Sequence, residues 1–553
     1  MTDVSALEAY TGQIAEAAAM SGAASAKQHH YIHGDAESDV ITESGPVPTI
    51  AKQARLSAEE TAALEGKLAD PNKGAALLGF LQDGAGSEGR KLSEKLREFV
   101  SVKDFGAKGD GIKDDTAAVQ VALNFGGNIY FPPGVYSIKK TLTVSVANTH
   151  LKGSGEGYIG TQIKTLRGFS GSNMFKVNDY GAIFEGIMLW GDGKLRGVDA
   201  TISGIDFDRA DLAADIDCFV KNCAFSYLNT CIRAIGKNIS IRDSLFGQAK
   251  RGITFNQRAG TSCYGVRIER NRFHGVGGAD YKGSADNDPD VVGANPGYCI
   301  DARETGDITF TQIVDNYADT SGRFFIGRLP FGTLSGNVIK DAWSTAIQVE
   351  NSTHVNITNN QIRSGFKSKD TGHGVYLASM VSMSNVEGNI VSGFCRHGIY
   401  HDSGYQNIIS NNQVIDNNFT GQLTGDGINI AAGTISNVVT GNVVRTTTGG
   451  SSGHRYGIYT GGSSCFFDGN LLQASMVANF LDESVSSLGM TQSVTETRRT
   501  VYGNGVPTTG LWSRGDRLLN TAPAPGGILG YICTTSGTAG STAVFKSFGT
   551  ISL

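Results

Sequence analysis

Proline, charge imbalance and long apolar runs are all scarce in this sequence. It has 11 prolines among 553 residues, and it contains 47 basic and 52 acidic side chains. So few prolines exclude the composition of a disordered linker. A net charge of −5 offers no basic surface for nucleic acid or an anionic membrane. Because no run of about 18 apolar residues occurs, no membrane insertion is expected.

Closely spaced cysteine pairs are also absent. The eight cysteines contain no CxxC pair. They are Cys218, Cys223, Cys231, Cys263, Cys299, Cys395, Cys465 and Cys533. Disulfide frameworks are typical of short secreted chains, so we expect reduced, buried cysteines that act as small hydrophobes. The N-terminus lacks a basic stretch followed by an apolar core, which predicts no signal peptide and synthesis in a cytoplasm.

Glycine, in contrast, is abundant, and asparagine recurs at regular steps. The 74 glycines form about 13 % of the chain, against about 7 % in average proteins, so many tight turns are expected. Asparagines in similar contexts are Asn271, Asn316, Asn337, Asn360, Asn389, Asn412, Asn442 and Asn470. The first step is 45 residues, a double step or a long insertion, and the others are 21 to 30. Such a period predicts a β-solenoid, whose aligned asparagines form hydrogen-bonded ladders.

A second series of apolar residues marks one strand in each repeat. Its expected members are Ile253, Ile300, Ile326, Ile347, Val375, Ile399, Ile428 and Ile458. One coil cannot bury its apolar face alone, so coils stack about 4.8 Å apart. The middle of the chain is therefore expected to be all-β, a solenoid of stacked coils.

The two ends of the chain differ from this repeat. Residues 1–98 are rich in Ala, Glu, Lys and Leu, with apolar residues three or four positions apart, which predicts short amphipathic helices. Because these helices are too short and polar for a large core, we expect them to pack on copies of themselves or on another protein. Residues 490–553 lose the repeat and predict a small β-module, since a bare solenoid end exposes strand edges.

The start of the solenoid carries a long motif. Residues 115–124 predict one helix with an N-cap and an apolar stripe. The segment VKDFGAKGDGIKDDTAAV (102–119), followed by FPPGVY (131–136), resembles the opening of the pectate-lyase-like right-handed β-helix superfamily. Residues 90–105 resemble the neck that precedes the β-helix of bacteriophage tail fibre and tailspike proteins. Residues 512–533 resemble C-terminal modules of such proteins.

The resemblance implies a fold, an assembly and a function. The fold would be a right-handed parallel β-helix over residues 99–489, capped by the predicted helix. The protein would be a homotrimer on the virion, where residues 1–98 bind the phage tail or baseplate. Residues 490–553 would serve trimerisation or glycan binding. The partner would be a bacterial surface polysaccharide, either capsule or lipopolysaccharide O-antigen.

Outward side chains of the repeated strand predict a sugar-binding groove. If Ile347 points inward, its alternating neighbours point outward. The resulting substrate-binding set is Arg303, Gln348, Tyr376, Tyr400, Asn429 and Tyr459. Sugars stack their C–H faces on aromatic rings and hydrogen-bond to amides. An ordinary solvated face is the alternative.

Three carboxylates of this surface are candidates for catalysis. Glycoside hydrolysis needs a protonated carboxylic acid and a second carboxylate. Glu350 and Asp402 fall in a further outward column two coils apart, with backbones about 10 Å apart, which is compatible with an inverting hydrolase. Asp301, two coils away on the other side and beside Arg303, is a third acid or a substrate ligand. The site lies within one subunit or between two.

Other functions stay open. A polysaccharide lyase acting by β-elimination would use a His or Tyr base with an Arg, and Tyr400, His401 and Arg396 are its candidates. His373, His397 and Asp426 align just before a glycine, where stacked side chains are more often structural. A host-receptor adhesin would use the same groove without turnover, and a structural virion component would use the solenoid as a spacer.

An acidic insertion lies between Phe273 and Cys299. It contains Asp280, Asp286, Asp288 and Asp290. It lacks the glycine and the distal glutamate of a helix–loop–helix calcium site, and loops on rigid scaffolds usually carry recognition. We therefore expect a groove wall, with no metal and no cofactor.

Overall fold

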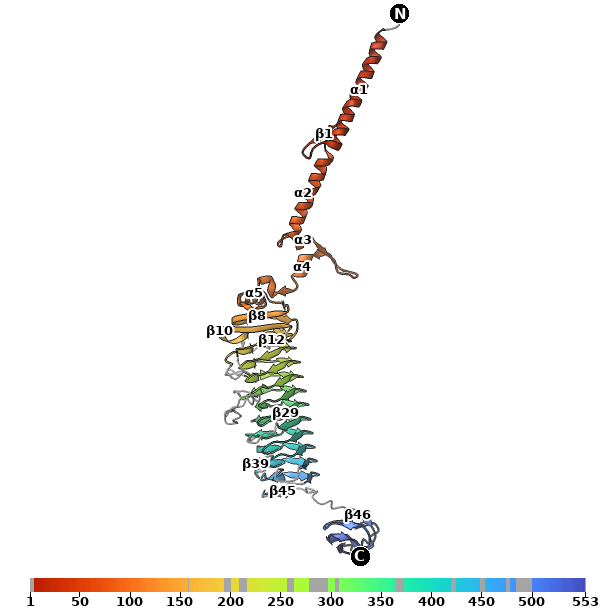
Figure 1. The fold of residues 1–553 in the computed structure, drawn as a ribbon. Coiled ribbons are helices and arrows are strands. Elements are labelled where there is room, and N and C mark those ends of the chain that lie inside the picture. Colours follow the sequence, from red (N-terminus) through yellow and green to blue (C-terminus); the bar gives the residue numbers. More distant parts are fainter. Residues whose placement is uncertain are drawn as a thin grey trace. The chain divides into compact units, whose positions relative to one another are not determined.

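The chain divides into two compact units, Met1–Phe99 and Val100–Leu553 (Figure 1). The computed structural model describes residues 4–157, 159–192, 200–207, 216–255, 263–277, 297–303, 308–364, 372–418, 424–447, 453–473, 478–483 and 500–552. Within these ranges no helix has both the length and the apolar character needed to cross a membrane.

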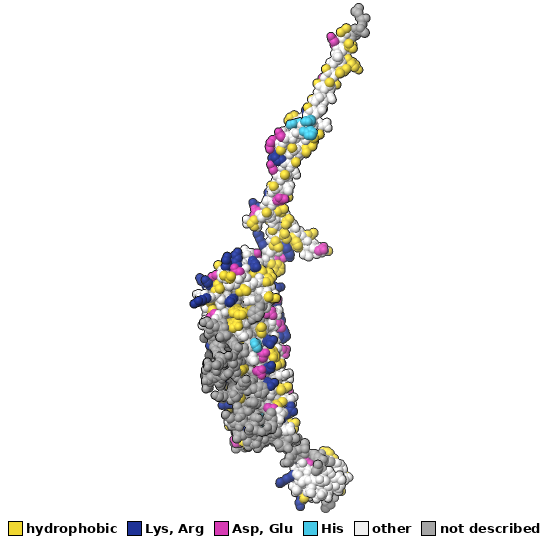
Figure 2. Space-filling view, viewed as in Figure 1, with side chains coloured by type: hydrophobic (Ala, Val, Ile, Leu, Met, Phe, Trp, Pro, Cys, Tyr) yellow, Lys and Arg dark blue, Asp and Glu magenta, His cyan; other side chains and the backbone are white. Residues whose placement is uncertain are grey.

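The N-terminal unit is dominated by two helices. Helix α1 (Val4–His33) has 30 residues and α2 (Ile50–Ala69) has 20, so the expectation of short helices is wrong here. Alanine-rich sequence without proline lets α1 continue for eight turns. No residue of α1 is buried, and Figure 2 shows hydrophobic side chains along it. The remaining elements are β1 (Asp39–Thr42), β2 (Gly45–Pro48), α3 (Gly74–Leu77), β3 (Gly79–Phe80), β4 (Arg90–Lys91) and α4 (Leu92–Leu96).

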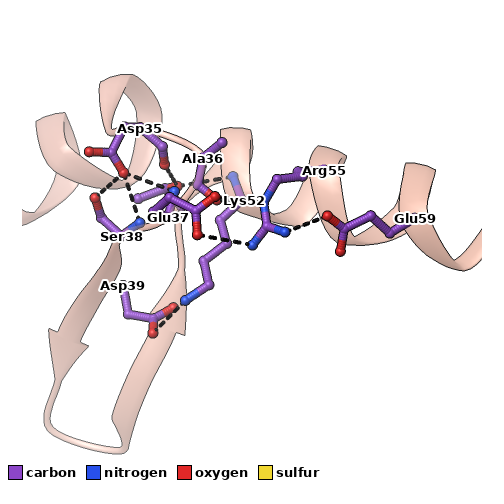
Figure 3. A network of polar contacts seen from close by, with 9 residues as sticks. Asp35, Ala36, Glu37, Ser38, Asp39, Lys52, Arg55 and Glu59 are labelled. Carbon is purple, nitrogen blue, oxygen red and sulfur yellow. Dashed lines mark hydrogen bonds and ion pairs between the residues drawn. The ribbon is translucent and has the colours of Figure 1, made fainter.

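A polar network joins the β1–β2 hairpin to α2 (Figure 3). Asp35 accepts hydrogen bonds from the Ser38 hydroxyl and from the backbone N–H groups of Glu37, at 2.9 Å, and Ser38, at 2.8 Å. These hydrogen bonds lower the pKa of the Asp35 carboxyl. Lys52 Nζ lies 2.8 Å from Asp39 Oδ2. Exposed pairs of this kind stabilise little, so the network mainly orients the hairpin.

The second unit contains a parallel β-helix, as predicted, and its coils have three faces. The first face is a 14-stranded parallel sheet. Its strands are β5 (Val100–Ser101), β7 (Asn128–Phe131), β9 (His150–Gly153), β11 (Ile183–Glu185), β14 (Phe219–Lys221), β17 (Ser240–Arg242), β21 (Arg267–Glu269), β25 (Gln312–Val314), β28 (Thr333–Ser335), β31 (Asn356–Thr358), β34 (Asn385–Glu387), β37 (Ile408–Ser410), β40 (Val438–Thr440) and β43 (Phe466–Asp468).

The second face follows the first within each coil. Its strands are β12 (Ile187–Trp190), β15 (Ala224–Ser226), β18 (Leu245–Gly247), β22 (Arg272–His274), β26 (Tyr317–Asp319), β29 (Val338–Ala342), β32 (Gln361–Ser364), β35 (Ile390–Ser392), β38 (Gln413–Ile415), β41 (Val443–Arg445) and β44 (Leu471–Gln473). Each pairs in parallel with the corresponding strand of the next coil.

The third face completes each coil and carries the residues of the predicted groove. Its strands are β13 (Ser203–Phe207), β16 (Thr230–Ala234), β19 (Arg251–Phe255), β23 (Tyr298–Ala302), β27 (Arg323–Gly327), β30 (Ile347–Glu350), β33 (Val375–Ala378), β36 (Ile399–Tyr405), β39 (Ile428–Ile435), β42 (Tyr456–Thr460) and β45 (Ala478–Asp482). The long strands β8 (Gly134–Val144) and β10 (Thr161–Val177) serve both this face and the second.

The predicted asparagine ladder runs without a break from Asn271 to Asn470. At every rung the Nδ2 group donates to Oδ1 of the asparagine in the next coil, over 2.9 to 3.1 Å. Asn271 bonds directly to Asn316, so the 45-residue step is one coil with a long insertion. The ladder supplies hydrogen-bond partners for buried backbone at the corner between the first and second faces.

One position of the predicted strand series is wrong. Phe325, not Ile326, lies in register with Ile300 and Ile347. Both Phe325 and Ile326 are apolar, so alternation alone did not distinguish them. The other inward members align as expected.

A short helix caps the start of the β-helix, as the motif implies. Helix α5 (Thr116–Phe125) buries Val119, Ala122 and Leu123. The side chain of its N-cap residue, Asp115, makes no hydrogen bond to the helix. The Asp115 carboxylate instead accepts hydrogen bonds from the backbone N–H groups of Lys108, at 2.7 Å, and Gly109, at 3.0 Å, in the preceding loop. The loop that contains the GDG motif (109–111) therefore folds around the Asp115 carboxylate.

The C-terminal segment forms a small β-module. A four-stranded sheet contains β46 (Thr500–Gly503), β48 (Arg517–Asn520), β49 (Ile528–Thr535) and β51 (Val544–Thr550), and β47 (Leu511–Trp512) pairs with β50 (Gly537–Thr538). Trp512, Leu518, Cys533 and Ala539 form its core.

All eight cysteines are free and buried, as predicted. Desolvation raises the pKa of Cys223 and of Cys299 to about 12. These thiols are therefore protonated and unreactive at neutral pH.

Candidate functional site

The predicted outward residues share one column of the third face. Strand register aligns them from coil to coil, with Ile326 filling one coil. In order, the column is Asp301, Ile326, Gln348, Tyr376, Tyr400, Asn429 and Tyr459. Parallel stacking thus aligns residues spread over 159 positions, from 301 to 459, in one column. Asp301, Ile326 and Asn429 of this column are buried.

The tyrosines at the centre of the column stack on one another. The rings of Tyr376 and Tyr400 lie 5.0 Å apart at 19°, and His373 and His397 stack beside them, 5.2 Å apart at 5°. Tyr400 also lies 4.9 Å from His397. Because ring faces are used within this cluster, the column offers phenol hydroxyls more than ring faces to a sugar. Sugar binding by these tyrosines stays a prediction.

Two candidate acids flank the tyrosines. Glu350 Oε1 accepts from Gln348 Nε2 at 2.6 Å, and Asp402 Oδ1 accepts from the Tyr400 hydroxyl at 3.2 Å. Glu350 lies in register with Ala378, and Asp402 follows in the next coil. The two carboxylates therefore stand two coils apart, about 10 Å between backbones.

Both candidate carboxylates affect the pKa of the Tyr376 hydroxyl. Burial raises the pKa of Tyr376, and the negative charges of Asp402 and Glu350 raise it further. Burial and the neighbouring Asp402 raise the pKa of Tyr400 to about 12. Both phenols are therefore neutral hydrogen-bond donors at neutral pH, between two acids.

Asp301, the third candidate acid, is bound by its neighbour. Arg303 donates from Nε and an Nη atom to its two oxygens, at 2.9 and 2.8 Å. Asp301 is 5 % exposed, and this pairing raises the pKa of Arg303. The Arg303 guanidinium also lies 4.2 Å from the Tyr298 ring. This ion pair occupies both carboxylate oxygens.

Asn429 is oriented by a buried ion pair. Asp426, which is fully buried, receives Arg455 at 2.9 and 2.8 Å, and Asn429 Nδ2 at 2.6 Å. His397 Nδ1 lies 3.3 Å from the same carboxylate. Burial alone would raise the pKa of Asp426, but its interactions with His397 and Arg455 outweigh burial and lower the pKa.

Tyr459 ends the column and has an acidic partner. Its hydroxyl donates to Glu483 Oε2 at 2.7 Å. This bond, ahead of burial, raises the pKa of Tyr459 to about 12. The Arg455 guanidinium lies 5.5 Å from the Tyr459 ring.

His401, a candidate base for elimination, points into the core and away from the groove. It is fully buried, and its Nε2 lies 3.3 Å from the Val381 carbonyl and 3.1 Å from Asn407 Nδ2. Burial lowers the pKa of His401 to about 4. That role is therefore wrong for His401, because strand alternation turns it inward between Tyr400 and Asp402.

Three residues of this surface escaped sequence reasoning. Arg323, Arg455 and Glu483 lie where strands begin or end, whereas the search considered positions just after each inward residue. Arg323 pairs in register with Tyr298. The sequence pattern that could have revealed them is the row of residues at strand starts, which includes His373, His397 and Asp426.

Metal ligation finds no support in the described residues. No group of three His, Cys, Asp or Glu side chains is placed to hold an ion there. The acidic insertion with Asp280, Asp286, Asp288 and Asp290 lies outside the described residues.

Two protein families match parts of the chain. Residues 99–208 match "Rhamnogalacturonase A/epimerase, pectate lyase-like". Residues 291–472 match "Right handed beta helix region". The first match contains the capping helix, and the second contains the whole column from Asp301 to Tyr459.

Curated relatives match only in part. Plasmin and fibronectin-binding protein A of Streptococcus pneumoniae is 29 % identical over 188 residues, 32 % of this chain and 24 % of that protein. The pre-neck appendage protein of Bacillus phage phi29 is 39 % identical over 67 residues, 12 % of this chain and 8 % of that protein. The chain thus spans at most about a quarter of these relatives.

Solved structures match over most of the chain. Tailspike protein 3 of bacteriophage CBA120 has a TM-score of 0.57 and 15 % identity, covering 90 % of this chain and 78 % of that one. The tailspike of E. coli bacteriophage HK620, solved with a pentasaccharide, has a TM-score of 0.55 and 12 % identity, covering 88 % and 98 %. At such identity the likeness concerns the fold. Together with the two matched families, it shows that the chain has the right-handed parallel β-helix fold.

Proposed function

We propose that this chain is a bacteriophage tailspike that binds and depolymerises a bacterial surface polysaccharide, capsule or O-antigen, as an endo-glycosidase. The observation that carries the proposal is the pair of acids flanking the Tyr376 hydroxyl on a surface column of phenols and amides. Such a column can follow a long polymer across several coils. The likeness to solved tailspikes supports the same assignment.

Glu350 and Asp402 are the proposed catalytic pair. One protonates the leaving glycosidic oxygen, and the other removes a proton from the attacking water on the opposite side of the sugar. A backbone separation of about 10 Å leaves room for that water, as in inverting glycosidases. Gln348 and Tyr400 hold the two carboxylates through their hydrogen bonds.

The remaining predicted residues bind substrate. Asn429 offers its carbonyl oxygen to the sugar. Tyr376 binds at the middle of the column and Tyr459 at its end. Asp301 neutralises and orients Arg303 through its bidentate pairing. In this proposal Asp301 transfers no proton.

Hydrolysis is favoured over β-elimination by the surroundings of the candidate bases. His401 is buried away from the groove, and the pKa of Tyr400, raised to about 12, disfavours the phenolate that elimination would require. A lyase base also needs direct reach to the substrate proton. An adhesin without turnover remains the second candidate, since the groove would serve binding alone.

The proposed protein works as a homotrimer on the virion. Residues 1–98 attach it to the phage tail or baseplate, in keeping with an α1 helix that buries no residue of its own. Residues 490–553 contribute trimerisation or glycan binding.

Incubation with a panel of purified capsules and O-antigens tests this function. New reducing ends without ultraviolet absorption support hydrolysis, whereas absorption at the unsaturated-uronate band identifies elimination. A polymer that binds and stays intact identifies an adhesin. Absence of binding across capsules and O-antigens from the bacteria that the virion infects would overturn the proposal.

A further inference from the structure

Two consecutive hydrogen bonds link an arginine to one of the candidate acids. Arg323, at the start of β27, donates from Nη1 to Gln348 Oε1 at 2.9 Å. Gln348, in β30 of the next coil, donates from Nε2 to Glu350 Oε1 at 2.6 Å. The Arg323 guanidinium also lies 5.9 Å from the centre of the Tyr298 ring. The Gln348 amide therefore lies between a guanidinium and a carboxylate.

The two partners leave the Gln348 amide one favourable orientation. A guanidinium carries only donors, so it can bind the amide oxygen and not the amide NH2 group. An ionised carboxylate carries only acceptors, so it can bind the NH2 group and not the oxygen. Reversing the amide would set donor against donor at Arg323 and acceptor against acceptor at Glu350. Arg323 therefore makes Gln348 present an N–H to Glu350.

The surroundings of Arg323 favour this contact with Gln348. In the preceding coil, both oxygens of Asp301 accept hydrogen bonds from Arg303, at 2.9 and 2.8 Å. Ile326, which is 2 % exposed, lies in register with Gln348 and offers no polar side-chain group to its amide. The neighbouring carboxylate and the neighbouring side chain thus leave the amide oxygen of Gln348 to Arg323.

The two candidate acids are held by different kinds of group. Glu350 accepts from an amide whose direction is fixed, over 2.6 Å. Asp402 accepts from the Tyr400 hydroxyl over 3.2 Å, beyond the usual O–H···O range of about 2.5–3.0 Å. A hydroxyl can donate or accept, so it can stay bonded to Asp402 in either protonation state. An N–H binds a charged carboxylate more strongly than a neutral acid, so Gln348 matches an ionised Glu350.

We propose that Arg323 is a positioning residue which, through Gln348, holds Glu350 as the ionised carboxylate that removes a proton from the attacking water. Asp402 is then the acid. The water oxygen bonds to the anomeric carbon as Glu350 takes its proton, and the bond from that carbon to the leaving oxygen breaks as Asp402 protonates that oxygen. One water is consumed, and exchange with solvent then removes the proton from Glu350 and returns one to Asp402. This inference rests on the proposed function and adds separate roles for the two acids.

Loss of this hydrogen-bonded chain should slow turnover without weakening polymer binding. Without Arg323 the amide can turn, and Glu350 loses the donor that fixes its position. Arg323→Met and Gln348→Leu should each lower kcat about tenfold or more, because small displacements of a reacting group cost rate, while KM changes less than about twofold. Reducing-end release from the recognised polymer measures both constants. A raised KM with unchanged kcat would mean that Arg323 binds substrate, and would overturn the positioning role.

A double variant tests whether Arg323 acts through Gln348. If it does, a chain with both Arg323→Met and Gln348→Leu should be no slower than the slower single variant. Two independent contributions would instead multiply, to about a hundredfold loss or more. Multiplied losses would therefore overturn the inference.

Further variants separate positioning from folding. Arg323→Lys keeps a cationic donor and should recover most of the rate that Arg323→Met loses. Arg267→Met, at an exposed arginine at the start of β21 on the first face, is the matched control and should turn over at the full rate. Urea midpoints check that each variant is folded. If Arg323→Met does not fold, Gln348→Leu decides, because a normal kcat in that variant contradicts the proposal.

Azide distinguishes the roles of the two acids. Azide attacks the anomeric carbon without losing a proton, so it replaces water where the base is missing but gives the leaving oxygen no proton. Sodium azide should therefore speed Glu350→Ala at least about tenfold, part of what a general base contributes, and leave Asp402→Ala slow. Mass spectrometry should detect fragments that end in a glycosyl azide.

Two outcomes would count against different claims. Rescue by azide of Asp402→Ala and not of Glu350→Ala would reverse the two roles and overturn this inference, while the catalytic pair stands. Full activity of Glu350→Ala without azide would refute the proposed catalytic pair itself, whatever the result at Arg323.

Discussion

At the scale of single residues, partners decide what each carboxylate can do. Asp301 is closed by a bidentate arginine, and Asp426 is buried with Arg455 and His397. Asp402, in contrast, accepts a hydrogen bond from the Tyr400 hydroxyl at 3.2 Å. Aspartates of the third face therefore differ in role: Asp301 and Asp426 hold arginines in place, and Asp402 is a candidate acid.

The first prediction concerns the catalytic pair. Glu350→Gln and Asp402→Asn should each lower turnover about a hundredfold or more, the range for loss of a general acid or base, while polymer binding is retained. Reducing-end release on the recognised polymer measures the effect. Glu387→Gln on the first face is the control and should cleave normally. Normal cleavage by both groove variants would refute the assignment.

The second prediction concerns buried histidines. Burial lowers the pKa of His401 and of His454 to about 4, so between pH 4 and the unfolded value near 6.5 the unfolded chain binds more protons. The free energy of unfolding should therefore fall as pH drops through this window, by about 2 kcal/mol per histidine at pH 5.

Urea unfolding at pH 7 and pH 5 measures this loss. His454→Gln should narrow the difference between the two midpoints, and His33→Gln, at an exposed site in α1, should leave it unchanged. An unchanged difference in the His454 variant would show that this histidine does not titrate as argued.

At the scale of elements, the corner ladder joins strands that are distant in sequence. Asn389 accepts from the backbone and side chain of Asn360, at 3.0 and 2.9 Å, and donates to the Ile357 carbonyl and Asn412 Oδ1, at 2.8 and 3.0 Å. One amide thus serves three coils.

The third prediction removes one rung. Asn389→Ala leaves buried donors and acceptors without partners, so we expect a loss of about 2–4 kcal/mol in the free energy of unfolding. Asn356→Ala, exposed on β31, is the control and should change it by less than about 0.5 kcal/mol. Chemical denaturation compares the two, and equal effects would mean that the ladder adds no stability.

At the scale of the whole molecule, the candidate site and the long helices belong to different units. The column from Asp301 to Tyr459 lies within Val100–Leu553, and the long helices lie within Met1–Phe99. Among the described residues, the buried core of the β-helix contains residues from Val100 onward.

The fourth prediction deletes residues 1–98. The shortened chain should stay soluble and trimeric and should cleave the recognised polymer at the rate of the full chain. Light scattering and reducing-end assays check this outcome. Loss of folding on deletion would contradict an attachment role for the segment.

The sequence by itself determined the β-solenoid, the helix over residues 115–124, the asparagine ladder and the outward column, and the family resemblance added that this helix caps a right-handed β-helix. The solenoid, the ladder and the column follow from local periodicity, because strand alternation and coil repeat both depend on short-range order. Tertiary structure alone decided that Phe325 replaces Ile326 in the core, that His401 turns inward, and that Arg323 meets Gln348. These features depend on how side chains from different coils fill shared space, and periodicity carries no information about that packing.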